Sequence, residues 1–368
     1  MSVGVQNQGA SEGELSLRNS RDLRSSRENT LAAVWAAIKR NGFTLAMLLA
    51  VALAFLFPAP GARGGWMHAD ILNNLGVALI LFVQGLGMAV ERMKAGLRNW
   101  PLHLIIQGFT FLVFPLIGLG WYAGSQIFWP GEPPGLRNGF LYLCVLPSTV
   151  STSVVLTNVA KGNTSAAIFN AALSNIMGVA LTPILVHLLM QSSGQTGPLG
   201  SLMIKVTLLT LLPFLVGMSL RLAVRDLVDA NRRWLNRVSN AVILFIVYTA
   251  FCDSVKARTW VTYGIGVTAE VLAGVALLFA TVAGLVWALS EGARLNRADR
   301  ITALFCSVKK TLAMGVPLAR LIFGPSADLG LILLPIMFYH PFQLFVCGML
   351  ANRFAQGESY DVDRKNRS

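Results

Sequence analysis

A proline and five hydroxyl residues interrupt an apolar run between Pro147 and Ser153. The hydroxyl residues are Ser148, Thr149, Ser151, Thr152 and Ser153. The run predicts a membrane helix, and a backbone group in hydrocarbon is costly unless it has a hydrogen-bond partner. Proline removes one helical hydrogen bond, and Ser and Thr side chains compete for others. We therefore expect a helix that is broken at membrane depth, with its free groups turned toward a cavity.

A second apolar run, Ile301–Phe323, is interrupted in the same way. Its mid-span polar residues are Ser307, Lys309, Lys310 and Thr311, and Gly315 and Pro317 follow. Two interrupted segments in matching positions of two halves are typical of secondary transporters, which bind their solutes there. The four polar residues Ser307, Lys309, Lys310 and Thr311, together with the hydroxyl cluster, are our candidates for binding a solute or an ion.

Composition excludes an ordinary soluble protein. The chain of 368 residues is 54% hydrophobic and 13% charged, whereas soluble domains carry about 25% charged residues. This indicates an all-α polytopic membrane protein. The net charge of +13 lies between the apolar runs, so we interpret it as a signal for membrane orientation and predict no nucleic-acid partner. The four cysteines lie in apolar runs without metal-site spacing and are predicted to be buried free thiols.

The apolar runs predict ten spans, at approximately 43–57, 71–90, 101–122, 137–158, 164–190, 200–220, 239–257, 262–289, 301–322 and 327–350. The run 43–57 is short enough for a signal peptide, but the polar region before it is too long for one. Basic residues gather on the side of the N-terminus, for example at Arg92, Lys94, Arg98, Lys161, Arg221, Arg225, Arg294 and Arg353. The positive-inside rule therefore places both termini, 1–42 and 351–368, in the cytoplasm.

The linker 191–199 divides the spans into two halves, 43–190 and 200–350. Because each half has five spans, an odd number, the second half starts on the opposite side of the membrane and the halves are expected to be inverted repeats. The interrupted spans 137–158 and 301–322 are each the fourth of their half. This agreement supports a site where the two breaks meet.

Three motifs resemble the bile acid:sodium symporter superfamily, and most closely its SBF-like branch. They are Phe82-x-x-Gly85-Leu86-Gly87, the stretch 146–157 followed by Lys161-Gly162-Asn163, and the stretch 305–319. The resemblance covers about residues 43–350. It implies ten helices in two inverted five-helix repeats, with a panel domain packed on a core domain in which two broken helices cross.

The resemblance also implies where a cation would bind. Members that use sodium supply oxygen ligands from the first broken helix, from the next helix, and from a Glu with a nearby Gln in the second broken helix. On this chain the first two sets correspond to Ser151, Thr152 and Ser153, and to Asn170, Ser174 and Asn175. The third set has no counterpart, because Ile301–Phe323 holds lysines and no acid. Sodium coupling is therefore in doubt. Gln107 corresponds loosely to a glutamine that sodium-using members carry in their third helix.

Lys309 and Lys310 are adjacent, so they point about 100° apart on a helix. One or both snorkel to the interface, or the span boundary lies elsewhere, or an ammonium group is tethered in the crossing, where it replaces a bound cation or meets an anionic solute. Glu270, within the span 262–289, is a candidate partner for a lysine. It is alternatively part of a structural ion pair, exposed near the outer end, or a proton-coupling group. The single polar residues on apolar helices are interpreted as donors of interhelical hydrogen bonds rather than as ligands: Gln84, His103, Gln107, His187, His340 and Gln343.

No catalytic or metal-binding motif is present, so we predict neither an enzyme nor a metal site. The sequence favours secondary active transport of an organic, anionic solute by alternating access, with Na⁺ or H⁺ as the possible coupling ion. One alternative is a proton-coupled or uncoupled efflux or exchange carrier, and another is a non-transporting regulatory membrane protein. We expect a monomer or homodimer in a cell membrane, with a bacterial inner membrane as the default.

Overall fold

The structure, a computed structural model, describes residues 42–43, 45–88, 99–192, 199–258, 261 and 266–365, although not the side chains of 151, 190–192, 199–209 and 357–365. The N-terminal tail up to residue 41, most of the linker 191–199, and Arg92, Lys94 and Arg98 lie outside this description. The chain divides into two compact units, Met1–Leu49 and Ala50–Ser368. The arrangement described below is that of the second unit.

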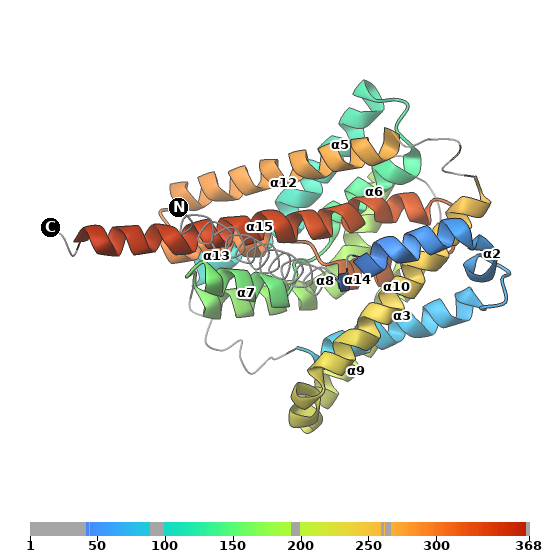
Figure 1. Cartoon of the computed structure of the whole chain (residues 1–368), viewed down its shortest axis with the longest axis horizontal. Coiled ribbons are helices and arrows are strands. Elements are labelled where there is room, and N and C mark those ends of the chain that lie inside the picture. The colour runs from blue at the N-terminus through green and yellow to red at the C-terminus, as the bar shows by residue number, and fades with distance from the viewer. Residues whose placement is uncertain are drawn as a thin grey trace, which may run out of the picture. The chain divides into compact units, whose positions relative to one another are not determined.

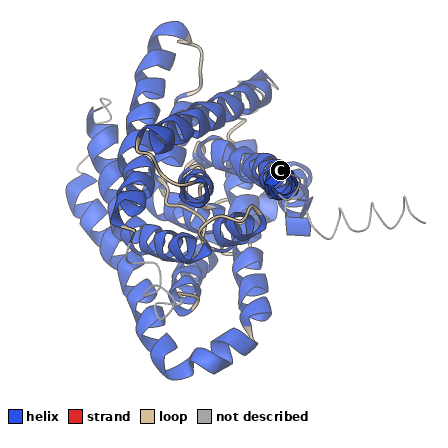
Figure 2. Cartoon of the chain, turned by 90° about the vertical axis from the view of Figure 1, so that its left-hand side faces the viewer, coloured by secondary structure: helices blue, strands red, loops and turns tan. Residues whose placement is uncertain are grey.

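Every regular element in the described ranges is helical (Figure 2). The helices are α2 (Pro58–Gly61), α3 (Ala69–Leu86), α4 (Trp100–Gly108), the π-helical turn η3 (Phe109–Val113), α5 (Phe114–Phe128), α6 (Pro134–Val145), α7 (Ser151–Val159), α8 (Thr164–Ser192), α9 (Leu199–Ala230), α10 (Arg232–Lys256), α12 (Gly266–Gly292), α13 (Arg297–Ser307), α14 (Leu312–Phe323) and α15 (Leu329–Lys365). A shorter apolar helix, Leu45–Leu56, precedes them.

Seven helical segments of the described chain are long and apolar enough to cross a membrane. They are Ala69–Leu86, Trp100–Phe128, Thr164–Leu189, Arg232–Lys256, Gly266–Gly292, Arg297–Phe323 and Leu329–Gln356. The prediction of an all-helical polytopic membrane protein is confirmed. The predicted span 43–57 overlaps the shorter helix, 137–158 is divided between α6 and α7, and 200–220 lies within α9.

Helix breaks occur inside both segments that the sequence singled out. Helix α6 ends at Val145, and Leu146 is extended (φ −71°, ψ 149°) because a residue before a proline avoids the helical region. Helix α13 ends at Ser307 without a proline in the break, and Thr311 is extended (φ −90°, ψ 119°) before α14 begins. The chain is thus non-helical at 146–150 and at 308–311.

Helices α3 and α9 cross with their backbones in direct contact. A Cβ atom added at Gly85 would lie 2.1 Å from the carbonyl oxygen of Phe214, and one at Gly217 would lie 2.1 Å from that of Phe82. No larger residue fits without separating the helices, so both glycines are required by packing.

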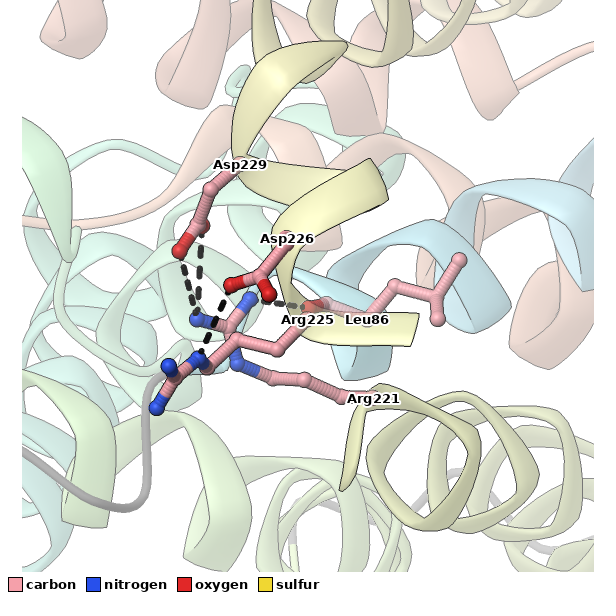
Figure 3. A network of polar contacts seen from close by, with 5 residues as sticks. All are labelled: Leu86, Arg221, Arg225, Asp226 and Asp229. Carbon is pink, nitrogen blue, oxygen red and sulfur yellow. Dashed lines mark hydrogen bonds and ion pairs between the residues drawn. The ribbon is translucent and has the colours of Figure 1, made fainter. Parts of the chain in front are cut away.

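A buried arginine fixes this crossing at its end (Figure 3). Arg221, one turn after Gly217, donates from Nη1 to the carbonyl oxygen of Leu86 at the end of α3, at 2.8 Å. Its Nη2 lies 3.3 Å from Oδ1 of Asp229, beyond the kink of α9 at Val224. A cation at the carboxyl end of α3 also complements the helix dipole.

The broken segments lie among the longest helices. Helix α6 packs against α5 and α15, and α13 packs against α12, which runs beside α15 (Figure 1). Helix α8 contacts α7, α6 and α13. The polar groups freed at the two breaks are therefore enclosed by α8 on one side and α15 on the other.

Candidate functional site at the two helix breaks

The two breaks touch each other directly. The backbone N–H of Thr311 donates to the carbonyl oxygen of Pro147 at 3.0 Å, and Oγ of Ser148 donates to the carbonyl oxygen of Cys306 at 2.7 Å. Each break thus satisfies polar groups that the other break exposes. The structure brings together the two segments that the sequence analysis selected.

Lys310 joins the second break to the end of α6. Its Nζ atom donates to the carbonyl oxygens of Leu146 at 2.7 Å, Cys144 at 2.9 Å and Thr110 at 3.3 Å. It also lies 3.9 Å from the ring centroid of Phe114, and the side chain is 0% exposed. The last carbonyls of a helix have no helical donor, and a helix carboxyl end favours a cation. The break in α6 therefore creates an oxygen cage that the Lys310 ammonium fills.

The carbonyl of Thr110 is available because of a proline five residues later. In η3, the N–H of Phe114 donates to the carbonyl oxygen of Phe109 rather than to that of Thr110. Pro115 follows and has no N–H to give. Sequence reasoning missed Thr110, although Pro115 inside a predicted span was the available signal.

Gln343 of α15 holds the backbone of the same lysine. Its Oε1 accepts from the N–H of Lys310 at 2.8 Å, and its Nε2 donates to the carbonyl oxygen of Lys310 at 2.8 Å. Tyr339, one turn earlier, donates its hydroxyl to the carbonyl oxygen of Val308 at 2.6 Å. Gln343 was predicted as an interhelical donor, which is confirmed, but its contact with the second break was not foreseen.

Helix α8 plays the corresponding part at the first break. Oγ of Ser174 accepts from the N–H of Ser148 at 3.0 Å, and Nδ2 of Asn175 donates to the carbonyl oxygen of Ser148 at 2.8 Å. The structure thus places the predicted residues Ser174 and Asn175 at the break. The hydroxyl of Thr182 reaches the carbonyl oxygen of Val145 at 3.0 Å.

Asn170, predicted as a site residue together with Ser174 and Asn175, contacts side chains of α4. Its Nδ2 lies 2.8 Å from Nδ1 of His103, and its Oδ1 accepts from Nε2 of Gln107 at 3.1 Å. Asn170 and Gln107 therefore form a partly buried link between α4 and α8.

A hydroxyl cluster begins α7. Oγ1 of Thr149 lies 2.7 Å from Oγ1 of Thr152 and 3.2 Å from Oγ of Ser153. The side chain of Ser151 lies outside the described atoms. Among the described side chains, none caps the first turn of α7 or of α14. The amino ends of both half-helices therefore offer backbone N–H groups and positive dipole ends near the crossing.

Lys309 contrasts with its neighbour. It is also 0% exposed, yet its Nζ has no hydrogen-bond partner among the described residues. The titratable groups that interact electrostatically with it are Cys306 of α13 and His340 and Cys347 of α15. Oγ of Ser307 is likewise buried and without a partner there. Neither lysine snorkels, so that alternative is wrong for both.

Glu270 lies away from the lysines. It is partly exposed near the start of α12, and its charged neighbours are Glu132 and Arg137. Arg137 Nε lies 3.3 Å from Oε2 of Glu132. The structure therefore places Glu270 beside an ion pair instead of beside a lysine of the second break.

The four cysteines are buried free thiols, as predicted.

A buried carboxylate gathers three helix starts. Oδ2 of Asp299 accepts from Nδ2 of Asn99 at 2.7 Å and of Asn296 at 2.8 Å, and Oδ1 accepts from Nδ2 of Asn163 at 2.9 Å. These asparagines directly precede α4, α13 and α8. The contacts tie the first turns of three helices to one residue. Sequence reasoning did not find this group.

These features define a class of protein. A helical chain with several segments apolar enough to span a membrane, and with two broken segments (α6–α7 and α13–α14) in contact through polar groups at their breaks, is typical of membrane transporters. The chain belongs to the SBF-like CPA transporter family (DUF4137), whose pattern it matches over residues 41–356. It is therefore a multi-pass membrane transporter and not an enzyme.

Curated relatives agree with this assignment. The chain is 37% identical to the protein named "Uncharacterized protein PA2026" of Pseudomonas aeruginosa, over 86% of this chain and 93% of that one. It is 36% identical to "Putative symporter YfeH" of Escherichia coli, over 85% and 92% of the two chains. It is 28% identical to "Sodium/bile acid cotransporter 7" of Danio rerio, over 86% and 94%.

Proposed function

We propose that this transporter carries a small organic anion by alternating access around the crossing of the two breaks, and that it needs no sodium at this crossing. The Lys310 ammonium, held by three carbonyl oxygens, is the observation that carries the proposal. Backbone carbonyls are ligands that a hard cation would also use. A tethered ammonium in this cage supplies the positive charge permanently.

Helix packing supports ten spans in two inverted repeats. Helix α5 packs against α6 as α12 packs against α13, and α7 packs against α8 as α14 packs against α15. Helix α6 meets α15 as α13 meets α8. Exchanging the halves thus maps one set of contacts onto the other. We infer a core domain around the two breaks and a panel domain that contains α3, α9 and α10.

The amino end of α7 is the part best suited to an anionic solute. It offers uncapped backbone N–H groups and the hydroxyls of Thr149, Thr152 and Ser153. Helix amino ends bind carboxylates and phosphates through such groups. Thr152 is partly exposed, so a solute reaches the cluster at that residue.

A proton-coupled carrier is the second candidate. Lys309 favours this function, because it is buried without a hydrogen-bond partner in the described part of the chain. A buried ammonium without a partner is costly, and losing its proton removes that cost.

We place the protein in a cell membrane with both termini in the cytoplasm, on the evidence of the basic residues in the sequence.

The proposal is tested by thermal unfolding of the purified protein in sodium and in choline. A cation that binds only the folded state raises the apparent Tm by mass action. We expect no sodium-specific shift in the wild type. Lys310→Ala should acquire one, since its empty cage of carbonyls then accepts a sodium ion.

Lys309→Ala is the matched control, because the same side chain is removed next to the cage without emptying it. It should behave like the wild type in both salts. A sodium-specific rise of Tm in the wild type would contradict the proposal. So would a Lys310→Ala protein that remains folded and gains no sodium dependence.

A further inference from the structure

The two half-helices that follow the breaks differ in how far they are covered. In α14, nine of twelve residues are buried. In α7, only Ser153 and Thr157 are buried among the residues 152–159. Helix α14 packs against α3, α9, α10 and α15, whereas the described contacts of α7 are mainly with α8, α13 and α15. The two half-helices occupy corresponding places in the two halves, but α14 is covered by neighbouring helices and α7 is largely uncovered.

Helix α14 is attached to α3 at both ends. At its first turn, the carbonyl oxygen of Ala313 accepts from Nε2 of Gln84 at 2.9 Å. At its last turn, Nη2 of Arg320 lies 2.6 Å from Oδ1 of Asp70 in the first turn of α3. Each charge lies at the helix end that its sign suits, the cation at a carboxyl end and the anion at an amino end.

The ion pair joins a covered cation to an accessible acid. The side chain of Arg320 is 4% exposed and that of Asp70 is 52% exposed. Asp253 of α10 is a second acid that acts on Arg320, and it accepts from the backbone N–H of Arg63 at 2.7 Å. Three segments thus converge on one guanidinium group.

The contact is also breakable. Only one hydrogen bond joins Arg320 to Asp70, and Nε of Arg320 has no partner among the described residues. A two-pronged arginine–carboxylate pair would be stronger and more rigid. Because the Asp70 side chain is 52% exposed, separating it from Arg320 buries no unpaired carboxylate.

We propose that Asp70 and Arg320 are gating residues of the transporter: their ion pair holds α14 against α3 and closes the pathway on the side where α3 begins. The inference rests on the alternating access proposed above. In this conformation α14 is closed onto the panel domain, and α7, its counterpart, is not. Opening on the α3 side requires the pair to separate.

The test uses a cysteine placed beneath the pair. Ala313 lies seven residues before Arg320, about 10 Å along the helix, and contacts α3 through Gln84. The Ala313→Cys protein is incorporated in vesicles and labelled with an impermeant maleimide added to either side in turn. Wild-type protein, whose four cysteines are buried, gives the background.

Adding Arg320→Gln should raise the labelling rate from the α3 side about tenfold, which corresponds to the loss of one charge-assisted hydrogen bond. Exchanging the charges, with Asp70→Arg and Arg320→Asp together, should restore slow labelling. Arg137→Gln is the matched control, because it removes an arginine whose ion pair with Glu132 joins residues of one segment. It should leave the rate unchanged.

Unchanged labelling in Arg320→Gln would overturn the inference. Equal acceleration from both sides, or failure of the charge exchange to restore slow labelling in a folded protein, would also overturn it. Sodium dependence is independent of these rates. A wrong gate therefore leaves the proposal on Lys310 intact, and a wrong cation cage leaves the gate intact.

Discussion

The two helix breaks meet the same physical requirement with different chemistry. The first break follows from Pro147 and leaves carbonyl oxygens at the end of α6. A hydroxyl and an amide group of α8 hydrogen-bond the backbone of Ser148 in this break. The second has no proline, relies on Gln343 of α15, and adds an ammonium group. One break has surplus acceptors and the other has surplus donors. The Lys310 ammonium of the second break thus meets carbonyl oxygens that the first break leaves without a helical donor.

The largest effect should come from the lysine pair. Lys310→Met leaves three buried carbonyls without their donor, at about 1–3 kcal/mol each, and should lower the free energy of unfolding by about 3 kcal/mol or more. Lys309→Met removes an amine without a partner in the described structure, so stability should stay the same or rise. Apparent Tm values in detergent compare the two variants. Equal losses would remove the distinction between the lysines.

Next in size is the loss of the side chains that hold the breaks. Gln343→Ala leaves two buried backbone groups of Lys310 without hydrogen-bond partners and should lower the free energy of unfolding by about 2–4 kcal/mol. Asn175→Ala leaves one buried group without this partner, the carbonyl oxygen of Ser148, and should lower the free energy of unfolding by about 1–3 kcal/mol. Denaturant unfolding of both variants measures the difference. A more damaging Asn175→Ala would show that α8 supports the crossing more than α15 does.

Glycines next to the breaks give a smaller, packing-based comparison. A Cβ at Gly178 would lie 2.5 Å from the ring of Pro147, and one at Gly315 would lie 2.7 Å from Cδ1 of Leu146. The proline ring cannot turn away, whereas a leucine methyl can. Gly178→Ala should therefore cost about 1–3 kcal/mol and Gly315→Ala less. The order of their Tm values tests this, and the reverse order would contradict it.

The smallest effects are expected from single hydroxyl groups. Thr152→Val removes a hydrogen bond to Thr149 and should cost about 0.5–1.5 kcal/mol. Ser307→Ala removes a hydroxyl that has no partner in the described structure and should be neutral. Thermal unfolding of the pair checks both. A destabilising Ser307→Ala would indicate that a bound molecule uses this hydroxyl.

The sequence predicted where the helices break, because proline, clustered hydroxyls and charges are recognisable inside apolar runs. It could not predict which lysine is satisfied, since Lys309 and Lys310 are chemically identical and differ only in direction. The roles of Thr110 and Gln343 depend on which helices meet, and a single sequence does not contain that information. The contacts of Asn170 with His103 and Gln107 were not foreseen for a related reason, because they depend on how α4 packs against α8.

Asp299 and its three asparagines have a consequence for how such a chain can change over generations. If Asp299 is replaced, three side-chain amides lose an acceptor at once, and if one asparagine is replaced the carboxylate loses a donor. The residues come from three separate stretches of sequence, with Asn296 and Asp299 in the same one, and each amide occupies its own place on the carboxylate, so one substitution does not repair another. We expect these positions to be inherited as a set, so that they mark descent among relatives even where the solute has changed.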